Sequence, residues 1–229
     1  MTDGYVTEGV AEYVATLFPE DFKGICVDVG AYDPFWISNS WIFEDAGWDT
    51  YCIEPNTARI PKLKKHRKNV LEYACGDHNE DNVNLYIYKA PYAGPVDEPG
   101  NTKIKVGPYE GVMSGEAACT GLIQHASDQP NQYADFLDRV ILVKVRTLDW
   151  LMENEIKQDH IDLLSIDVEL NEMAVLKGID LKRWNPFAII IENQTPEDEV
   201  AQLAWLTELG YKKINRIGVN DVYVKSINI

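Results

Sequence analysis

Short continuous apolar runs alternate along the chain with longer stretches of helical spacing. Residues 24–30 are apolar apart from one aspartate and close on Gly30, which predicts a buried strand followed by a turn. Residues 38–46 carry apolar side chains at helical spacing and stop at Gly47, which predicts a helix. The same reasoning predicts strands at 50–55, 70–75, 140–145, 161–167 and 188–192, and helices at 61–67, 147–152, 171–177 and 196–209.

This alternation of strands and helices predicts right-handed βαβ units and therefore a mostly parallel sheet with helices on both faces. The run 188–192 is the most continuous apolar strand, so we expect it inside the sheet. Two further strands, 212–217 and 221–225, flank Gly218-Val219-Asn220 and predict an antiparallel hairpin at a sheet edge. The predicted fold is a Rossmann-like α/β domain, a single one spanning residues 1–229.

The middle of the chain interrupts this pattern. Residues 89–109 are rich in proline and glycine, and the run that follows to Tyr133 is small and polar. A long irregular insertion in a compact domain usually serves function or is disordered. We predict that residues 89–135 or thereabouts form a substrate lid over the sheet edge, with disorder as the alternative.

Composition and charge narrow the range of partners. The chain has 229 residues, 45% of them hydrophobic, and a net charge of −16, which disfavours binding to a phosphate backbone. The basic cluster at 62–68 is interpreted as the solvated face of a helix, with an anion-binding patch as the alternative. No apolar run reaches the ~18–20 residues of a membrane span, and the N-terminus does not resemble a signal peptide. We therefore expect a cytoplasmic protein without nucleic-acid or membrane partners.

The cysteines give no sign of a metal site. Cys26, Cys52, Cys75 and Cys119 form no C-x-x-C pair, and the first three fall in or beside predicted strands. Buried, reduced thiols are the expected state.

Candidate binding and catalytic residues lie where the predicted strands end. Open parallel sheets bind ligands at the carboxyl ends of their strands. The polar or small residues predicted at these ends are Asp28, Gly30, Glu54, Gly76, Asp77, Asp167, Glu192 and Asn193. Folding does not require this many acids at strand ends, so their presence predicts a binding site there.

The first predicted turn distinguishes between cofactors. A dinucleotide fold uses G-x-G-x-x-G, but only Gly30 is present, and Asp33-Pro34 stand where further glycines would lie. A carboxylate in this turn would repel a pyrophosphate and would suit a cofactor with an ammonium group, such as S-adenosylmethionine. Glu54 is spaced to accept hydrogen bonds from two ribose hydroxyls, as in NAD enzymes also, and Asp77 could reach the adenine amino group.

Several stretches in this order resemble the FkbM family of methyltransferases: 27–34, Ser38-Asn39, Gly47-Trp48, 53–56, 146–149, 165–169 with Glu172, and 176–178. The resemblance implies a class I methyltransferase fold and S-adenosylmethionine-dependent O-methylation of a sugar, polysaccharide or natural-product hydroxyl. One departure is Leu170, which replaces the glycine of the family's usual Asp-x-Glu-Gly. The cofactor contacts implied by the motifs and strand ends together are Asp28, Gly30, Ala31, Ser38, Asn39, Glu54, Pro55, Gly76, Asp77 and Asp167.

The later strand ends carry the predicted reaction chemistry. Asp167, Glu192 and Asn193 resemble the magnesium ligands of catechol-type O-methyltransferases, and Mg²⁺ there would bind the acceptor hydroxyl and lower its pKa. The alternative is that these acids are satisfied by backbone or contact the substrate directly. The candidate general bases are Asp167, Glu169 and Glu192, with His125 of the insertion as runner-up.

Three other functions compete with this hypothesis. An NAD-dependent oxidoreductase is disfavoured by the missing glycines. A non-catalytic nucleotide-binding or scaffold protein would not need acids at three further strand ends. A methyltransferase acting on RNA is disfavoured by the acidic charge, whereas one acting on protein is not. We expect a small-molecule or glycan acceptor, and the sequence is compatible with a homo-oligomer.

Overall fold

The computed structural model describes residues 9–88, 104–106, 109–111, 137–169, 171–193 and 195–226. The chain divides into two compact units, one formed by Met1–Glu80 with Lys144–Ile229 and the other by Asp81–Val143. The second unit contains the segment in which the substrate lid is predicted. Most of that segment, His125 included, lies outside the described residues.

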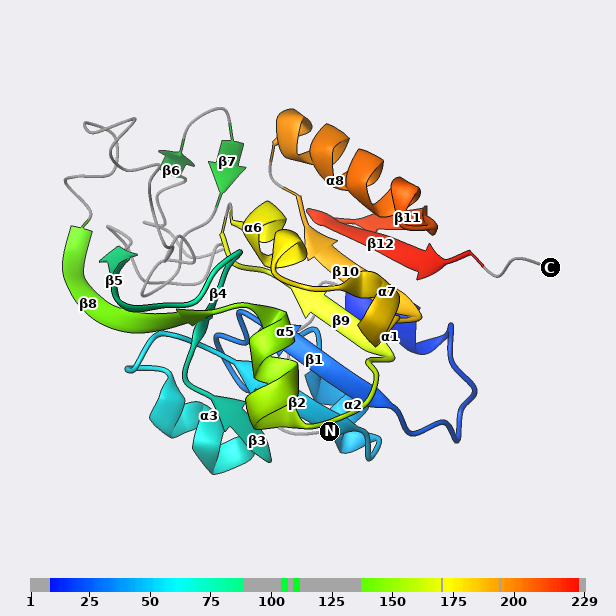
Figure 1. Cartoon of the computed structure of the whole chain (residues 1–229), viewed down its shortest axis with the longest axis horizontal. Coiled ribbons are helices and arrows are strands. Elements are labelled where there is room, and N and C mark those ends of the chain that lie inside the picture. Colours follow the sequence, from blue (N-terminus) through cyan, green and yellow to red (C-terminus); the bar gives the residue numbers. More distant parts are fainter. Residues whose placement is uncertain are drawn as a thin grey trace, which may run out of the picture. The chain divides into compact units, whose positions relative to one another are not determined.

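A seven-stranded sheet in the order β11-β12-β10-β9-β1-β2-β3 forms the centre of the first unit (Figure 1). Neighbouring strands from β10 to β3 pair in parallel, whereas β12 runs antiparallel to both β10 and β11. This confirms a mostly parallel, Rossmann-like sheet with a C-terminal antiparallel hairpin. The strands are β1 (Ile25–Val29), β2 (Asp49–Ile53), β3 (Asn69–Leu71), β9 (Leu163–Ile166), β10 (Ala188–Glu192), β11 (Tyr211–Ile217) and β12 (Asn220–Lys225).

Helices cover both faces of this sheet because alternate side chains of each buried strand point to opposite sides. Val27 and Leu164 pack with α5 to α8 in one core cluster, while Cys26 and Leu163 pack with α1 and α2 in another. Leu63 of α3 packs on Cys52, which is in register with Asp28 of β1. The helices are α1 (Val10–Ala15), α2 (Trp41–Asp45), α3 (Ile60–His66), α5 (Leu148–Leu151), which continues into the π-helical turn Met152–Ile156, α6 (Glu172–Lys177), α7 (Leu181–Trp184) and α8 (Pro196–Glu208).

The strand predicted at 70–75 is wrong in one respect, since it is two strands in two sheets. β3 ends at Leu71, and β4 (Ala74–Cys75) instead pairs in parallel with the end of β8 (Leu137–Arg146). The chain leaves the first sheet after Leu71, and the ring of Tyr73, between the two strands, lies 5.9 Å from that of Trp150. The predicted strand 140–145 is therefore part of the three-stranded sheet β4-β8-β5 and not of the main one.

Three strands, β5 to β7, were not predicted. β5 (Glu80–Tyr88) begins with polar residues that mask its strand character, although Leu85 and Ile87 are buried. Within the segment predicted as irregular, β6 (Ile104–Val106) and β7 (Tyr109–Gly111) form an antiparallel pair. Three-residue strands carry too short an alternation to stand out among prolines and glycines.

Two further expectations concern cysteines and membranes. Cys26, Cys52 and Cys75 are free and buried, as predicted, whereas Cys119 lies outside the described residues. Within the part of the chain that the structure describes, none of the helices has the length and apolar character that crossing a bilayer requires.

Candidate active site

The carboxyl ends of β1, β2, β9 and β10 meet at one edge of the main sheet. In register, Val29 of β1 faces Ile166 of β9, and Ile166 faces Ile191 of β10. The residues that follow at this level, Gly30, Asp167 and Glu192, therefore share one edge, and Glu54 follows β2 beside them. Parallel sheets bind their ligands at this edge.

Gly30 makes the closest backbone approach in this region. Its φ of +89° lies in the left-handed region, and a Cβ on it would fall 1.7 Å from the carbonyl oxygen of Asp167. The N–H of Asp167 donates to the carbonyl of Val29 (2.9 Å), which draws the end of β9 against the turn. Conformation and space therefore both require glycine here.

Glu54 is held rigidly at the end of β2. Its Oε2 accepts the backbone N–H of Tyr32 at 2.9 Å, and its Oε1 accepts that of Asn56 at 2.7 Å. Burial raises the pKa of Glu54 to about 7, although the two N–H donors and the nearby Arg59 oppose the shift. Each carboxylate oxygen has two lone pairs, so Glu54 can accept further hydrogen bonds from a ligand.

Asp33 is engaged within its own loop. Its Oδ1 accepts the N–H groups of Phe35 and Trp36, both at 3.0 Å, and its Oδ2 pairs with Lys62. Burial alone would raise the pKa of Asp33, but the hydrogen bonds from Lys62 and the backbone lower it. The carboxylate in this turn is thus neutralised by Lys62.

Asp28 and Ser38, which are predicted to bind cofactor, are both buried in the structure. The hydroxyl of Ser40 donates to Oδ2 of Asp28, and burial raises the pKa of Asp28. Ser38 Oγ accepts the N–H of Trp41 at 3.2 Å, at the start of α2. Asn39 is only partly buried and donates from Nδ2 to Ser165 Oγ at 3.3 Å.

The interpretation of the basic cluster 62–68 as a solvated helix face is wrong for one member, Arg67. Lys62 and Lys64 are exposed, but the side chain of Arg67 is 0% exposed and donates from Nε to Glu44 Oε2 at 2.7 Å. Burial of Arg67 could not be predicted, because a basic run carries no sign of which member turns inward.

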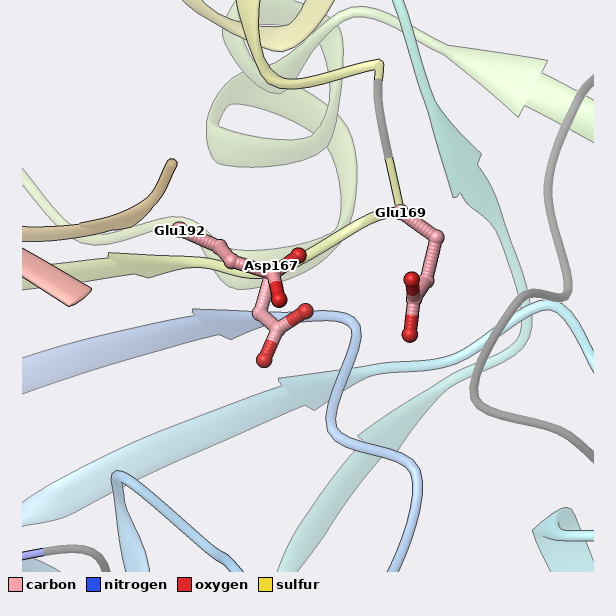
Figure 2. A group of neighbouring side chains, drawn as sticks. All are labelled: Asp167, Glu169 and Glu192. Carbon is pink, nitrogen blue, oxygen red and sulfur yellow. The ribbon is translucent and has the colours of Figure 1, made fainter. Parts of the chain in front are cut away.

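Three carboxylates, Asp167, Glu169 and Glu192, form what we call the acidic cluster (Figure 2). One oxygen from each lies within 4.8 Å of the others, with Glu192 buried and the other two partly exposed. Asp167 follows β9 and Glu192 closes β10, while Glu169 adopts a left-handed φ of +58°. The structure therefore brings all three predicted base candidates together.

Glu172 of α6 adds a further acid behind this cluster. It is 4% exposed, and its Oε1 accepts the N–H of Val168 at 3.0 Å. Burial raises the pKa of Glu172 to about 7, with a contribution from the negative charge of Asp167. The hydrogen bond fixes the loop that carries Asp167 and Glu169.

Asn193, a predicted metal ligand, is bound to the neighbouring strand. Its Nδ2 donates to Asp221 Oδ2 at 3.0 Å, and its backbone N–H donates to Val219 at 2.8 Å. Lys213 also donates to Asp221 Oδ2, at 2.8 Å. Asn193 thus helps to anchor β10 to β12, and Glu169 supplies the third carboxylate near Asp167 and Glu192.

The remaining predicted cofactor residues lie in several settings. Ala31 is buried against Leu63, and Pro55 is partly exposed. The prediction that Gly76 and Asp77 end a strand of the main sheet is wrong, because they follow β4, which belongs to another sheet. The carboxylate of Asp77 bonds His78 Nδ1 at 2.6 Å. Contact between Asp77 and an adenine stays a prediction.

The three other histidines are exposed, and two of them have acidic partners. His78 bonds Asp77 and Glu80, and His160 bonds Asp159. His66 packs its ring 5.0 Å from that of Phe35. None of these contacts involves a residue of the acidic cluster.

Comparison with known proteins agrees with the geometry. A family model described as the methyltransferase FkbM domain matches residues 28–213, which include Gly30, Glu54 and the acidic cluster. No curated protein and no solved structure gives a significant match. Because the family model covers most of the chain, this protein belongs to the FkbM family of methyltransferases.

Proposed function

We propose that this methyltransferase moves the methyl group of S-adenosylmethionine to a hydroxyl of a sugar, polysaccharide or natural product, on a class I form of the Rossmann-like fold. The observation that carries the proposal is Glu54, buried and fixed by two backbone N–H groups next to the Gly30 turn. A carboxylate at this strand end suits the two ribose hydroxyls of an adenosine cofactor.

The first turn disfavours a dinucleotide through its glycine content, and not through the charge of Asp33. No second glycine opens the turn for a pyrophosphate, and Asp33 is already paired with Lys62. The carboxylate of Asp28 already accepts the hydroxyl of Ser40. Asp167, whose backbone touches Gly30, is the better candidate for the partner of the cofactor's ammonium group.

Methyl transfer from a sulfonium is an in-line displacement. The acceptor oxygen forms a bond to the methyl carbon while the carbon–sulfur bond breaks, which leaves the neutral thioether S-adenosylhomocysteine. The hydroxyl proton must pass to a base, and a carboxylate of the acidic cluster is the proposed acceptor.

A divalent cation is the second part of the proposal. Asp167, Glu169 and Glu192 offer hard oxygen ligands of the kind that Mg²⁺ binds, and their oxygens lie close enough to share one ion. Such an ion would lower the pKa of the acceptor hydroxyl. Asn193 remains a candidate ligand beside them, since its Nδ2 is bonded to Asp221 while its buried Oδ1, the atom that would bind a cation, has no hydrogen-bond partner.

Transfer of tritium from methyl-labelled S-adenosylmethionine tests the proposal. Purified protein is incubated with a panel of monosaccharides, nucleotide sugars and oligosaccharides, with Mg²⁺ or with EDTA, beside the variant Asp167→Asn. Label in a glycan that disappears with the variant supports O-methylation, and loss of label in EDTA supports the metal. Label in added protein would point to a protein methyltransferase, and bound cofactor without any transfer to a scaffold.

A further inference from the structure

A buried guanidinium lies where the sequence predicts solvated lysines and arginines. Arg67 follows α3, and its side chain is fully buried, as is nearly all of Glu44, its partner in α2. A buried charge is tolerated only if it is paired and its donors find acceptors. The hydrogen-bond partners of Arg67 therefore show which parts of the structure it connects.

These partners lie in α2 and in the segment 30–40, which we call the cofactor loop. Nε of Arg67 donates to Glu44 Oε2 at 2.7 Å, and Nη2 donates to Ser40 Oγ at 2.7 Å. Nη1 reaches Ser38 Oγ at 3.3 Å and the carbonyl of Pro34 at 3.4 Å. One planar group thus ties the end of α3 to three points of the cofactor loop.

Arg67 also sets the direction of a hydroxyl. Because its Nη2 donates to Ser40 Oγ, the Ser40 proton is free to point to Asp28 Oδ2, 2.5 Å away. Asp28 also interacts with Ser165, whose oxygen accepts from Asn39. The loop is therefore fastened at its end, through Ser40, to the strand from which it starts.

We infer that Arg67 is a positioning residue for the cofactor site: it fixes the path of the cofactor loop without touching cofactor or acceptor. The inference rests on the proposed function, because the same loop presents the Tyr32 N–H to Glu54 and carries Gly30. A displaced loop would move Glu54 away from its place. Lysine cannot replace Arg67, since a single ammonium cannot span Glu44, Ser40 and Ser38 together.

A double-variant experiment separates positioning from mere charge balance. Arg67→Met leaves Glu44 buried without its cation, so both Tm and affinity for S-adenosylhomocysteine should fall. Arg67→Met/Glu44→Gln removes both charges and should recover most of the lost Tm. If Arg67 positions the loop, the dissociation constant of the double variant stays at least ~10-fold above wild type, which corresponds to ~1.4 kcal/mol. Recovery of both Tm and affinity would overturn the inference.

Two matched variants complete the design. Glu44→Gln alone keeps the contacts of Arg67 to the loop, so it should lower Tm while the dissociation constant changes by less than ~3-fold, or ~0.7 kcal/mol. Val14→Ala in the buried face of α1 should lower Tm in the same way, again without loss of affinity. A loss of affinity in Val14→Ala comparable with that of the double variant would contradict a specific role for Arg67.

Amide hydrogen exchange without ligand keeps this test independent of the proposed function. The Tyr32 and Trp36 amides are bonded to Glu54 and Asp33. Both should exchange faster in the double variant than in Glu44→Gln. If wild-type protein fails to bind S-adenosylhomocysteine, the proposed function fails, while faster exchange still supports the role of Arg67. Unchanged exchange at both amides would overturn that role.

Discussion

Two regions that share one edge of the sheet differ in how close their acids lie to one another. Around the cofactor loop, acids are matched by donors: Glu54 accepts two backbone N–H groups, Asp33 pairs with Lys62, and Glu44 with Arg67. In the acidic cluster, three carboxylates crowd within 4.8 Å, two of them partly exposed. The first arrangement fixes a shape, whereas the second concentrates negative charge, as a site for binding and proton transfer requires.

The contrast indicates where changes should affect folding and where they should affect chemistry. Substitutions that change the path of the cofactor loop itself should alter cofactor affinity, in most cases together with stability. Neutral substitutions in the acidic cluster relieve repulsion between like charges, so they should spare stability and reduce the reaction. The variants below test this division, from the largest expected effect to the smallest.

Gly30→Ala should be the most damaging single change in the loop. Its Cβ would collide with the carbonyl oxygen of Asp167, 1.7 Å away, in addition to the cost of a positive φ. We expect a loss of at least ~3 kcal/mol in the free energy of unfolding, or failure to fold. Gly210→Ala is the matched control, because Gly210 has a similar φ of +84° with nothing within 4 Å of the added Cβ.

The control should lose only about 1–2 kcal/mol, the cost of the left-handed backbone for a residue with a Cβ. Urea unfolding monitored by tryptophan fluorescence compares the two variants. Equal losses would mean that the contact between Gly30 and Asp167 has no special importance.

Glu192→Gln should separate chemistry from binding. Removing one carboxylate of the acidic cluster should reduce methyl transfer by about 10²–10⁴-fold if that group accepts the proton or holds the ion. Affinity for S-adenosylhomocysteine and Tm should stay close to wild type. Single-turnover transfer and calorimetry measure these separately, and an unchanged rate would remove Glu192 from the proposed chemistry.

Glu172→Gln should change how stability depends on pH. The folded-state pKa of Glu172 is about 7, above its ordinary value of 4.5, so the folded protein holds this proton more tightly than the unfolded chain does. Its contribution to stability is full below pH 4.5 and is lost as pH rises through 7. The variant should therefore gain stability relative to wild type across this range, by about 1–3 kcal/mol.

Denaturant unfolding at several pH values between 4.5 and 8 follows this difference. Glu208→Gln, at the exposed end of α8, is the control and should show no such trend. A constant difference between Glu172→Gln and wild type would mean that Glu172 is ionised throughout.

Lys62→Met should have the smallest effect. Lys62 is 56% exposed, and exposed ion pairs contribute about 0–1 kcal/mol. Asp33 would still accept the N–H groups of Phe35 and Trp36, so the turn should persist. Thermal unfolding at low and high salt measures the difference, and a loss above ~2 kcal/mol would show that Lys62 is essential to the loop.

The sequence predicted the sheet and its ligand edge because both depend on local patterns. Apolar runs ending in glycine or an acid located Gly30, Glu54, Asp167 and Glu192 at strand ends. Pairing of parallel strands then brings such ends together, without any knowledge of side-chain packing. The same rule failed for Asp77, because the chain passes from the main sheet at β3 to another sheet at β4.

Side-chain direction could not be predicted in the same way. Asp28 and Ser38 match the family's motif, yet both are buried. Asp28 accepts the hydroxyl of Ser40, and Ser38 accepts the N–H of Trp41. Arg67 belongs to no recognised motif, and only its buried contacts with Glu44 and Ser40 reveal its place. Asn193 follows β10 as expected, but its bond to Asp221 depends on a strand that returns from far along the chain.

The most direct test of the account is calorimetric titration with S-adenosylhomocysteine, with NAD as the competing cofactor. We predict micromolar binding to wild-type protein, no binding of NAD, and a loss of at least ~10-fold in affinity for Glu54→Ala, or ~1.4 kcal/mol. Circular dichroism must show that the variant is folded. Folded wild-type protein that does not bind S-adenosylhomocysteine, or that binds NAD equally well, would contradict the proposed cofactor site.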